Sequence, residues 1–135
     1  MCVSPELEAE VQWLWSNRKS APDEVQQASK IEKYRRLTGE CDAYGQYLLG
    51  MCYFWGWGVT QDHKRAAELH TQSAEQGNVR GQVQLGDDYL HGLGVTQNKD
   101  LARQWLSRSA HQGFQFAKVY LKQEFPEFYD TQFSS

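Results

Sequence analysis

The sequence predicts an all-α solenoid in which antiparallel helix pairs stack on one another. Three observations carry this prediction: a repeat with a period of 36 residues, glycines at fixed places within it, and apolar residues at helical spacing. Residues 41–76 align with residues 77–112 without a gap, and 14 of the 36 aligned positions are identical. A unit of this length buries little apolar surface alone, so neighbouring units must stack.

Composition narrows the class of protein. The chain has 135 residues, the usual size of one structural domain, and a formal net charge of −3. Mild acidity argues against a nucleic-acid partner, whose affinity comes from clustered basic side chains on phosphates. No apolar run approaches the roughly 18 residues of a membrane span, and the first residues lack the basic and apolar regions of a secretory signal. We therefore expect a cytoplasmic protein with neither nucleic-acid nor membrane partners.

The segment 1–40 is expected to form an N-terminal helical hairpin that caps the solenoid. Ser4 and Pro5 are typical of a helix start, and apolar residues follow them at helical spacing. Pro22 breaks this helix, and a second apolar series runs to Gly39. The hairpin lacks the glycines of the repeat, so we predict a cap rather than a further repeat.

The first repeat, residues 41–76, predicts two helices. The first helix is expected from about Ala43 to Trp55. Gly56 and Gly58 end it, because glycine readily adopts the left-handed conformation of a C-terminal cap. The second helix carries small and apolar residues at helical spacing, namely Ala66, Leu69, Ser73 and Ala74.

The second repeat, residues 77–112, keeps the same pattern. Asp62 and its counterpart Asn98 are the expected N-caps of the second helix in each unit. Gly50 recurs as Gly86 inside the first helix, where glycine costs about 1 kcal/mol relative to alanine. We expect that a partner backbone passes too close to these two glycines for a Cβ atom.

The last segment, residues 113–135, begins a third copy and then departs from the pattern. Ala117 and Leu121 keep the spacing of the first helix, but Lys122 stands where the other copies have glycine. No second helix is expected after it. The aromatic stretch 125–129 is predicted to fold over the open end of the solenoid, and a mobile tail used for recognition is the alternative.

The repeated pattern resembles the Sel-one-like repeat (SLR) family, a branch of the tetratricopeptide-like α/α solenoids. The matching positions in the first copy are Gly45, Leu49, Gly50, Tyr53, Gly56, Gly58, Val59, Asp62, Ala66, Ala67, Leu69, Ala74 and Gly77. The resemblance covers about Cys41 to Leu121. It implies a right-handed superhelix whose first helices line the concave face, and an adaptor role in the assembly of protein complexes.

Under this resemblance, the concave face is lined by one stripe of each first helix. The stripe comprises Tyr44, Tyr47, Met51 and Trp55 in the first copy, Arg80, Val83, Asp87 and His91 in the second, and Phe116, Val119 and Tyr120 in the third. Tyr, Trp, Met and Arg are enriched at protein interfaces, so we predict that this stripe binds a protein or peptide partner. Packing of Tyr47 and Trp55 against the N-terminal helices is the alternative for those two residues.

Asp87, Asp88 and His91 are the strongest candidates for catalytic residues, because a carboxylate one helical turn from an imidazole can orient it. No nucleophile motif accompanies them, and His63 and His70 do not have the spacing of a zinc motif. We therefore predict no enzymatic activity, no metal and no cofactor. A hydrolase that uses these three residues is the alternative from a different functional class.

The three cysteines are an odd number, which cannot form a complete set of intramolecular disulfides, so reduced thiols are expected. The leading hypothesis is a small adaptor that binds a protein or peptide and is a monomer. A narrower version is a bacterial immunity or antitoxin-like protein that occludes a toxin. A homo-oligomer, in which the C-terminal tail covers the open end of another copy, is a further alternative.

Overall fold

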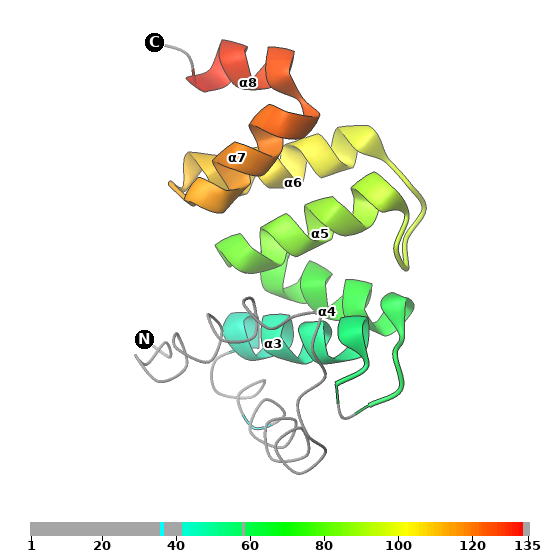
Figure 1. The fold of residues 1–135 in the computed structure, drawn as a ribbon. Coiled ribbons are helices and arrows are strands. Elements are labelled where there is room, and N and C mark those ends of the chain that lie inside the picture. The colour runs from blue at the N-terminus through cyan, green and yellow to red at the C-terminus, as the bar shows by residue number, and fades with distance from the viewer. Residues whose placement is uncertain (1–35, 37–41, 58, 134–135) are drawn as a thin grey trace.

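The computed structural model describes residues 36, 42–57 and 59–133. Within this part of the chain there are six α-helices and no strand, which confirms the predicted all-α class. The helices are α3 (Asp42–Trp55), α4 (His63–Glu75), α5 (Val79–His91), α6 (Lys99–His111), α7 (Gln115–Glu124) and α8 (Pro126–Phe133). Each helix packs against the next one in the chain, and Figure 1 shows the resulting stack from α3 to α8. The hairpin predicted for residues 1–40 lies outside the described residues, apart from a single helical position at Arg36.

Glycines end the helices where the sequence predicts it. Gly56 follows α3 with φ +72°, and Gly92 caps α5 with φ +68°, both in the left-handed region that favours glycine. Gly77 and Gly113 follow α4 and α6 with φ +91° and +92°. Gly58 lies outside the described residues. The turns between helices therefore depend on a backbone conformation that other residues adopt only with strain.

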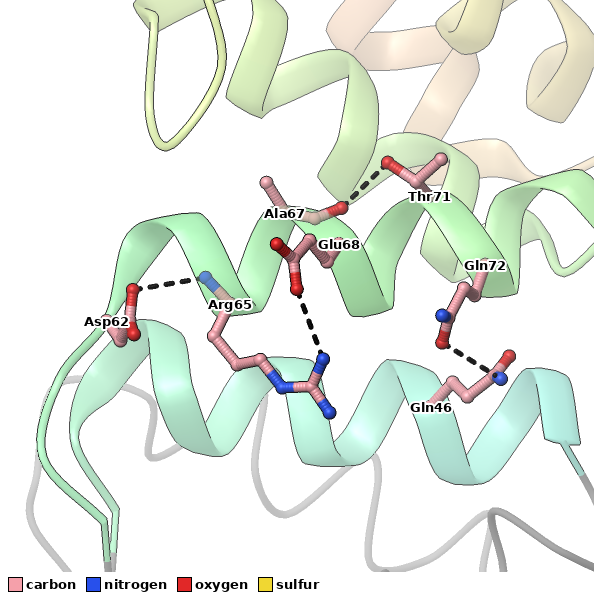
Figure 2. A network of polar contacts seen from close by, with 7 residues as sticks. All are labelled: Gln46, Asp62, Arg65, Ala67, Glu68, Thr71 and Gln72. Atoms are coloured by element: carbon pink, nitrogen blue, oxygen red, sulfur yellow. Dashed lines mark hydrogen bonds and ion pairs between the residues drawn. The ribbon is translucent and has the colours of Figure 1, made fainter.

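The two predicted N-caps are confirmed. The Asp62 carboxylate accepts a hydrogen bond of 3.1 Å from the Arg65 backbone N–H at the start of α4 (Figure 2). The Asn98 side chain accepts a bond of the same length from the Leu101 N–H at the start of α6. Each cap satisfies one of the free N–H groups that begin a helix.

Two serines that the repeats share tie the helices of each unit together. The Ser73 hydroxyl of α4 donates to the Ala43 carbonyl of α3 at 2.5 Å. The Ser109 hydroxyl of α6 donates to the Val79 carbonyl of α5 at 2.9 Å. Both serines are buried, so the small hydroxyl lets the helices approach while keeping its own polar atom satisfied.

A pair of shared glutamines repeats the same connection at the edge of each unit. The Gln76 amide donates to the Gln46 side-chain oxygen at 2.6 Å, and the Gln112 amide donates to that of Gln82 at 2.9 Å. Gln46 in turn donates to Gln72 at 3.1 Å, a contact between α3 and α4 that Figure 2 shows. Glutamines at identical positions of the two repeats thus join the two helices of each repeat in the same way.

The glycines inside the first helices lie against side chains of the second helices. A Cβ atom on Gly50 would lie 2.6 Å from Cδ2 of His70. A Cβ atom on Gly86 would lie 2.9 Å from Cγ of Leu106 and 3.3 Å from the Ala102 carbonyl oxygen. The close approach was predicted correctly, but the prediction of a passing backbone is wrong for Gly50, where an imidazole ring takes the space.

The third unit differs from its prediction, because a short second helix follows α7. Pro126 begins α8, where its missing N–H leaves no hydrogen bond unmade. Aromatic side chains of this region pack against the core cluster of α5, α6 and α7, namely Phe125, Phe128, Tyr129 and Phe133. The Lys118 and Lys122 ammonium groups lie 5.8 and 5.7 Å from the ring centroids of Phe133 and Tyr129. The prediction from sequence emphasised the aromatic residues of this segment and therefore missed the short helix that most of them belong to.

Candidate partner-binding pocket

A pocket of about 210 Å³ lies between the first helices of three successive units. Its walls come from α3, α5 and α7, and we call it the α3/α5/α7 pocket. The lining residues are Met51, Phe54 and Trp55 from α3, Val83, Gln84 and Asp87 from α5, and Phe116 and Tyr120 from α7.

Helical spacing explains why these side chains meet. Residues three and four apart share one face of a helix, and each of the three helices contributes lining residues at such spacing. Phe54 and Trp55 follow Met51 by three and four positions, and Tyr120 follows Phe116 by four. Because the same face recurs in each unit, stacking of the units joins three short stripes into one pocket.

The pocket contains much of the predicted stripe. Six of its eight lining residues belong to that stripe: Met51, Trp55, Val83, Asp87, Phe116 and Tyr120. The structure adds Phe54 and Gln84, which the sequence reasoning missed. Their signal was present, because Phe54 lies three positions after Met51 and Gln84 lies three positions before Asp87.

The remaining stripe residues lie elsewhere. Tyr47 is only 1% exposed and belongs to the core cluster around α3, against which Tyr44 packs partly buried. The Arg80 guanidinium lies 5.2 Å from the centroid of the Phe114 ring. His91 and Val119 are exposed but do not line the pocket.

Asp87 is the charged group of the pocket, and its side chain is 24% exposed. The Tyr120 hydroxyl donates a hydrogen bond to Asp87 Oδ1, and His91 Nδ1 lies 3.2 Å from the same oxygen. Burial raises the pKa of Tyr120, and the hydrogen bond to Asp87 raises it further. Tyr120 therefore stays a neutral phenol at physiological pH and donates its proton toward the carboxylate.

The structure separates the three candidate catalytic residues. Asp88 points into the core between α4 and α5, where its Oδ2 lies 2.8 Å from Nδ1 of the buried His70. Burial raises the pKa of Asp88, while the hydrogen bond and charge of His70 act in the opposite direction. Asp87 and His91 lie on a different side of α5 from Asp88, so the three do not form one cluster.

In the part of the chain that the structure describes, no group of three or more His, Cys, Asp or Glu side chains could hold a metal ion. Cys52 is buried in the core cluster around α3. None of the described helices has the length and apolar character needed to cross a membrane.

The repeat identifies the family. The Sel1 repeat pattern matches residues 43–78 and 79–114, which together make up more than half of the chain. The chain belongs to the Sel1 repeat family. Sel1 repeat proteins generally act as scaffolds for protein–protein interactions, and the family is a non-catalytic one.

Solved structures of bacterial proteins share this fold. A Sel1 repeat protein from Oxalobacter formigenes is 41% identical over 60% of this chain and 24% of its own, with a TM-score of 0.58. The protein c5321, a protective antigen present in uropathogenic Escherichia coli strains, displays an SLR fold. It is 35% identical over 78% of this chain and 22% of its own, with a TM-score of 0.68. The chain therefore spans about a quarter of the length of either protein. None of the curated proteins matches it.

Proposed function

We propose that this Sel1 repeat chain is an adaptor that binds an extended segment of a partner protein in the α3/α5/α7 pocket. One observation carries the proposal: the same face of three successive units converges on a single pocket. A partner segment that follows the stack would contact all three units at once.

The residues of the pocket suit a protein partner. Four of the eight lining side chains are aromatic, namely Phe54, Trp55, Phe116 and Tyr120. Aromatic anchors in pockets contribute much of the energy at protein interfaces. Phe116 and Val119 are 45% and 48% exposed on α7, and they extend the apolar surface beyond the pocket. Gln84 adds a side-chain amide that can bond to a peptide backbone.

Two of the three helices that form the pocket, α3 and α5, are fixed to the second helix of their own unit, which lowers the cost of binding. The serine and glutamine bonds fix α3 on α4 and α5 on α6 in the same way in each repeat. A preformed site loses less conformational freedom when a partner binds. The side chains of the pocket are thus positioned before the partner arrives.

A library of random peptides displayed on phage tests the proposal with the full chain as the target. Selected peptides are synthesised and their dissociation constants measured for the wild type and for Phe116→Glu. The substitution places a charge on an exposed side chain of the pocket, so the fold should survive and affinity should fall about tenfold or more.

Gln104→Glu is the matched control, because it adds the same charge to an exposed position of α6. Its affinity for the peptides should equal that of the wild type. Peptides that bind Phe116→Glu as tightly as the wild type would place the binding surface elsewhere and overturn the proposal.

A further inference from the structure

We infer that the α3/α5/α7 pocket receives one lysine or arginine side chain of the bound segment, with its charged end at Asp87. This inference rests on the proposed function and names the chemistry that the pocket selects. Its basis is a partly buried carboxylate with one free oxygen, surrounded by aromatic rings.

The Asp87 carboxylate has room for a cation. Both of its described side-chain contacts, from Tyr120 and from His91, fall on Oδ1. Among the described residues, no lysine or arginine forms an ion pair with Asp87. Oδ2 is therefore available to an incoming ammonium or guanidinium group, and a charge-assisted hydrogen bond is stronger in a partly desolvated site than in water.

The walls of the pocket suit the rest of such a side chain. Trp55, Phe116 and Tyr120 line it, and the faces of aromatic rings attract cations. Met51 and Val83 offer apolar surface to the aliphatic stem of a lysine or arginine. The volume of about 210 Å³ is smaller than the roughly 300–1,000 Å³ of sites for drug-sized ligands, and it suits one long side chain.

Three basic side chains of α5 and α7 lie against aromatic rings, and none of them forms an ion pair with Asp87. The Arg80 guanidinium lies over the Phe114 ring, and the ammonium groups of Lys118 and Lys122 lie over rings of α8. Glu124 contributes further negative charge near Tyr120. An acidic side chain would therefore meet repulsion in this pocket, whereas a basic one would meet the Oδ2 oxygen of Asp87, which pairs with no described lysine or arginine.

The first test uses single amino-acid probes on the full chain. N-acetyl-lysine methylamide, its neutral isostere N-acetyl-norleucine methylamide and N-acetyl-glutamate methylamide are titrated while backbone amide signals are followed by NMR. We expect signals of α5 and α7 around the pocket to shift with the lysine probe, at an affinity about tenfold higher than with norleucine.

Asp87→Asn should remove this preference, because the amide keeps the shape of the side chain and loses its charge. Asp100→Asn is the matched control, since it removes the same charge from a side chain of α6 that is 84% exposed. The inference would be overturned if the lysine and norleucine probes bound equally or if the glutamate probe bound best. It would also be overturned if both variants lost the same affinity for the lysine probe.

The peptides selected by the full chain separate this inference from the proposed function. Enrichment of Lys or Arg at one position, lost in selections against Asp87→Asn, would support both. Peptides that depend on Phe116 but carry no basic position would overturn the inference and leave the adaptor role standing. Lysine-probe binding that depends on Asp87, without any peptide that depends on Phe116, would support the cation site and overturn the adaptor role.

Discussion

The two repeats have the same backbone plan but fill one core position differently. His70 of α4 and Leu106 of α6 are separated by the repeat length of 36 residues. Each lies against the glycine inside the first helix of its own unit, which is Gly50 in one case and Gly86 in the other. Both side chains are fully buried. The same space therefore holds an imidazole in the first unit and an isobutyl group in the second.

The difference changes what joins the units. A leucine needs only apolar neighbours, but a buried imidazole needs a polar partner. His70 finds that partner in Asp88 of the next unit, at a position where the first unit has Cys52. His70 Nε2 and Asp88 Oδ1 have no hydrogen-bond partner among the described residues. The junction between the first and second units thus contains a buried polar pair whose bonding capacity is only partly used, beside the hydrogen bond of 3.2 Å that the Gln82 amide donates to the Ala74 carbonyl.

Breaking the pair of His70 and Asp88 should give the largest change in the free energy of unfolding. His70→Leu copies the second repeat into the first and leaves Asp88 buried without a partner, so we expect the free energy of unfolding to fall by about 3 kcal/mol. Adding Asp88→Leu removes the unpaired charge and should restore stability to within about 1 kcal/mol of the wild type or above it. Urea unfolding followed by circular dichroism measures both changes.

The equivalent position in the second repeat supplies the control. Leu106→Met keeps an apolar side chain of similar volume and should cost less than about 1.5 kcal/mol. If the single His70→Leu variant were as stable as the wild type, the polar pair would not hold the junction. If the double variant were no more stable than the single one, loss of packing rather than an unpaired charge would be the cause.

Replacing the glycine that lies against His70 or Leu106 by alanine should lower the free energy of unfolding by a smaller amount. This amount should also differ between the two repeats. The Cβ of Gly50→Ala would lie 2.6 Å from the His70 ring, against 2.9 Å from Leu106 for Gly86→Ala. The ring is held by Asp88 and cannot move away cheaply, so Gly50→Ala should cost about 2 kcal/mol and Gly86→Ala less. Thermal unfolding of the two variants compares them, and the reverse order would contradict a rigid imidazole.

The pH dependence of stability should give the smallest effect. Burial raises the pKa of Asp88 in the folded chain above its value of about 3.9 when unfolded. A raised pKa means that the contribution of Asp88 to stability is greatest at low pH and is lost as the pH rises through the folded value. The stability of the wild type minus that of Asp88→Asn should therefore fall as the pH increases from about 4, by no more than about 1.4 kcal/mol per pH unit.

Urea unfolding of the two proteins at a series of pH values measures this difference. The titratable groups that face Asp88, namely His70, Asp87 and His63, are present in both proteins, so the difference reports the Asp88 carboxyl group together with its contacts to them. A difference that rises with pH would show that the charge of His70, rather than burial, dominates the environment of Asp88.

Part of the pocket follows from the resemblance to the repeat family. That resemblance implied a stripe that includes Met51, Trp55 and Asp87, and helical spacing places the members from one helix on the same face. Phe54 and Gln84 lie at neighbouring positions of the same faces, and they follow once the helices are seen in three dimensions. The segment after α7 was harder to interpret, because its aromatic residues obscured the short helix that begins at Pro126.

The partner of Asp88 could not be derived in this way. Asp87 and Asp88 are adjacent in sequence, yet one faces the pocket and the other the core, because successive residues of a helix point about 100° apart. His70 lies 18 residues away on another helix. The sequence did indicate that His70 is buried, because it aligns with the apolar Leu106. The alignment does not show which residue forms a hydrogen bond with the imidazole.

The sequence by itself determined the family, the helix pairs and the turns between them. These depend on local chemistry, namely glycines at left-handed positions, Asp62 and Asn98 at helix starts, and a period of 36 residues. The tertiary structure decided which charged residue is buried and which remains accessible. That choice depends on the rotation of each helix against its neighbours, which is set by the packing of several units and by no single segment of the chain.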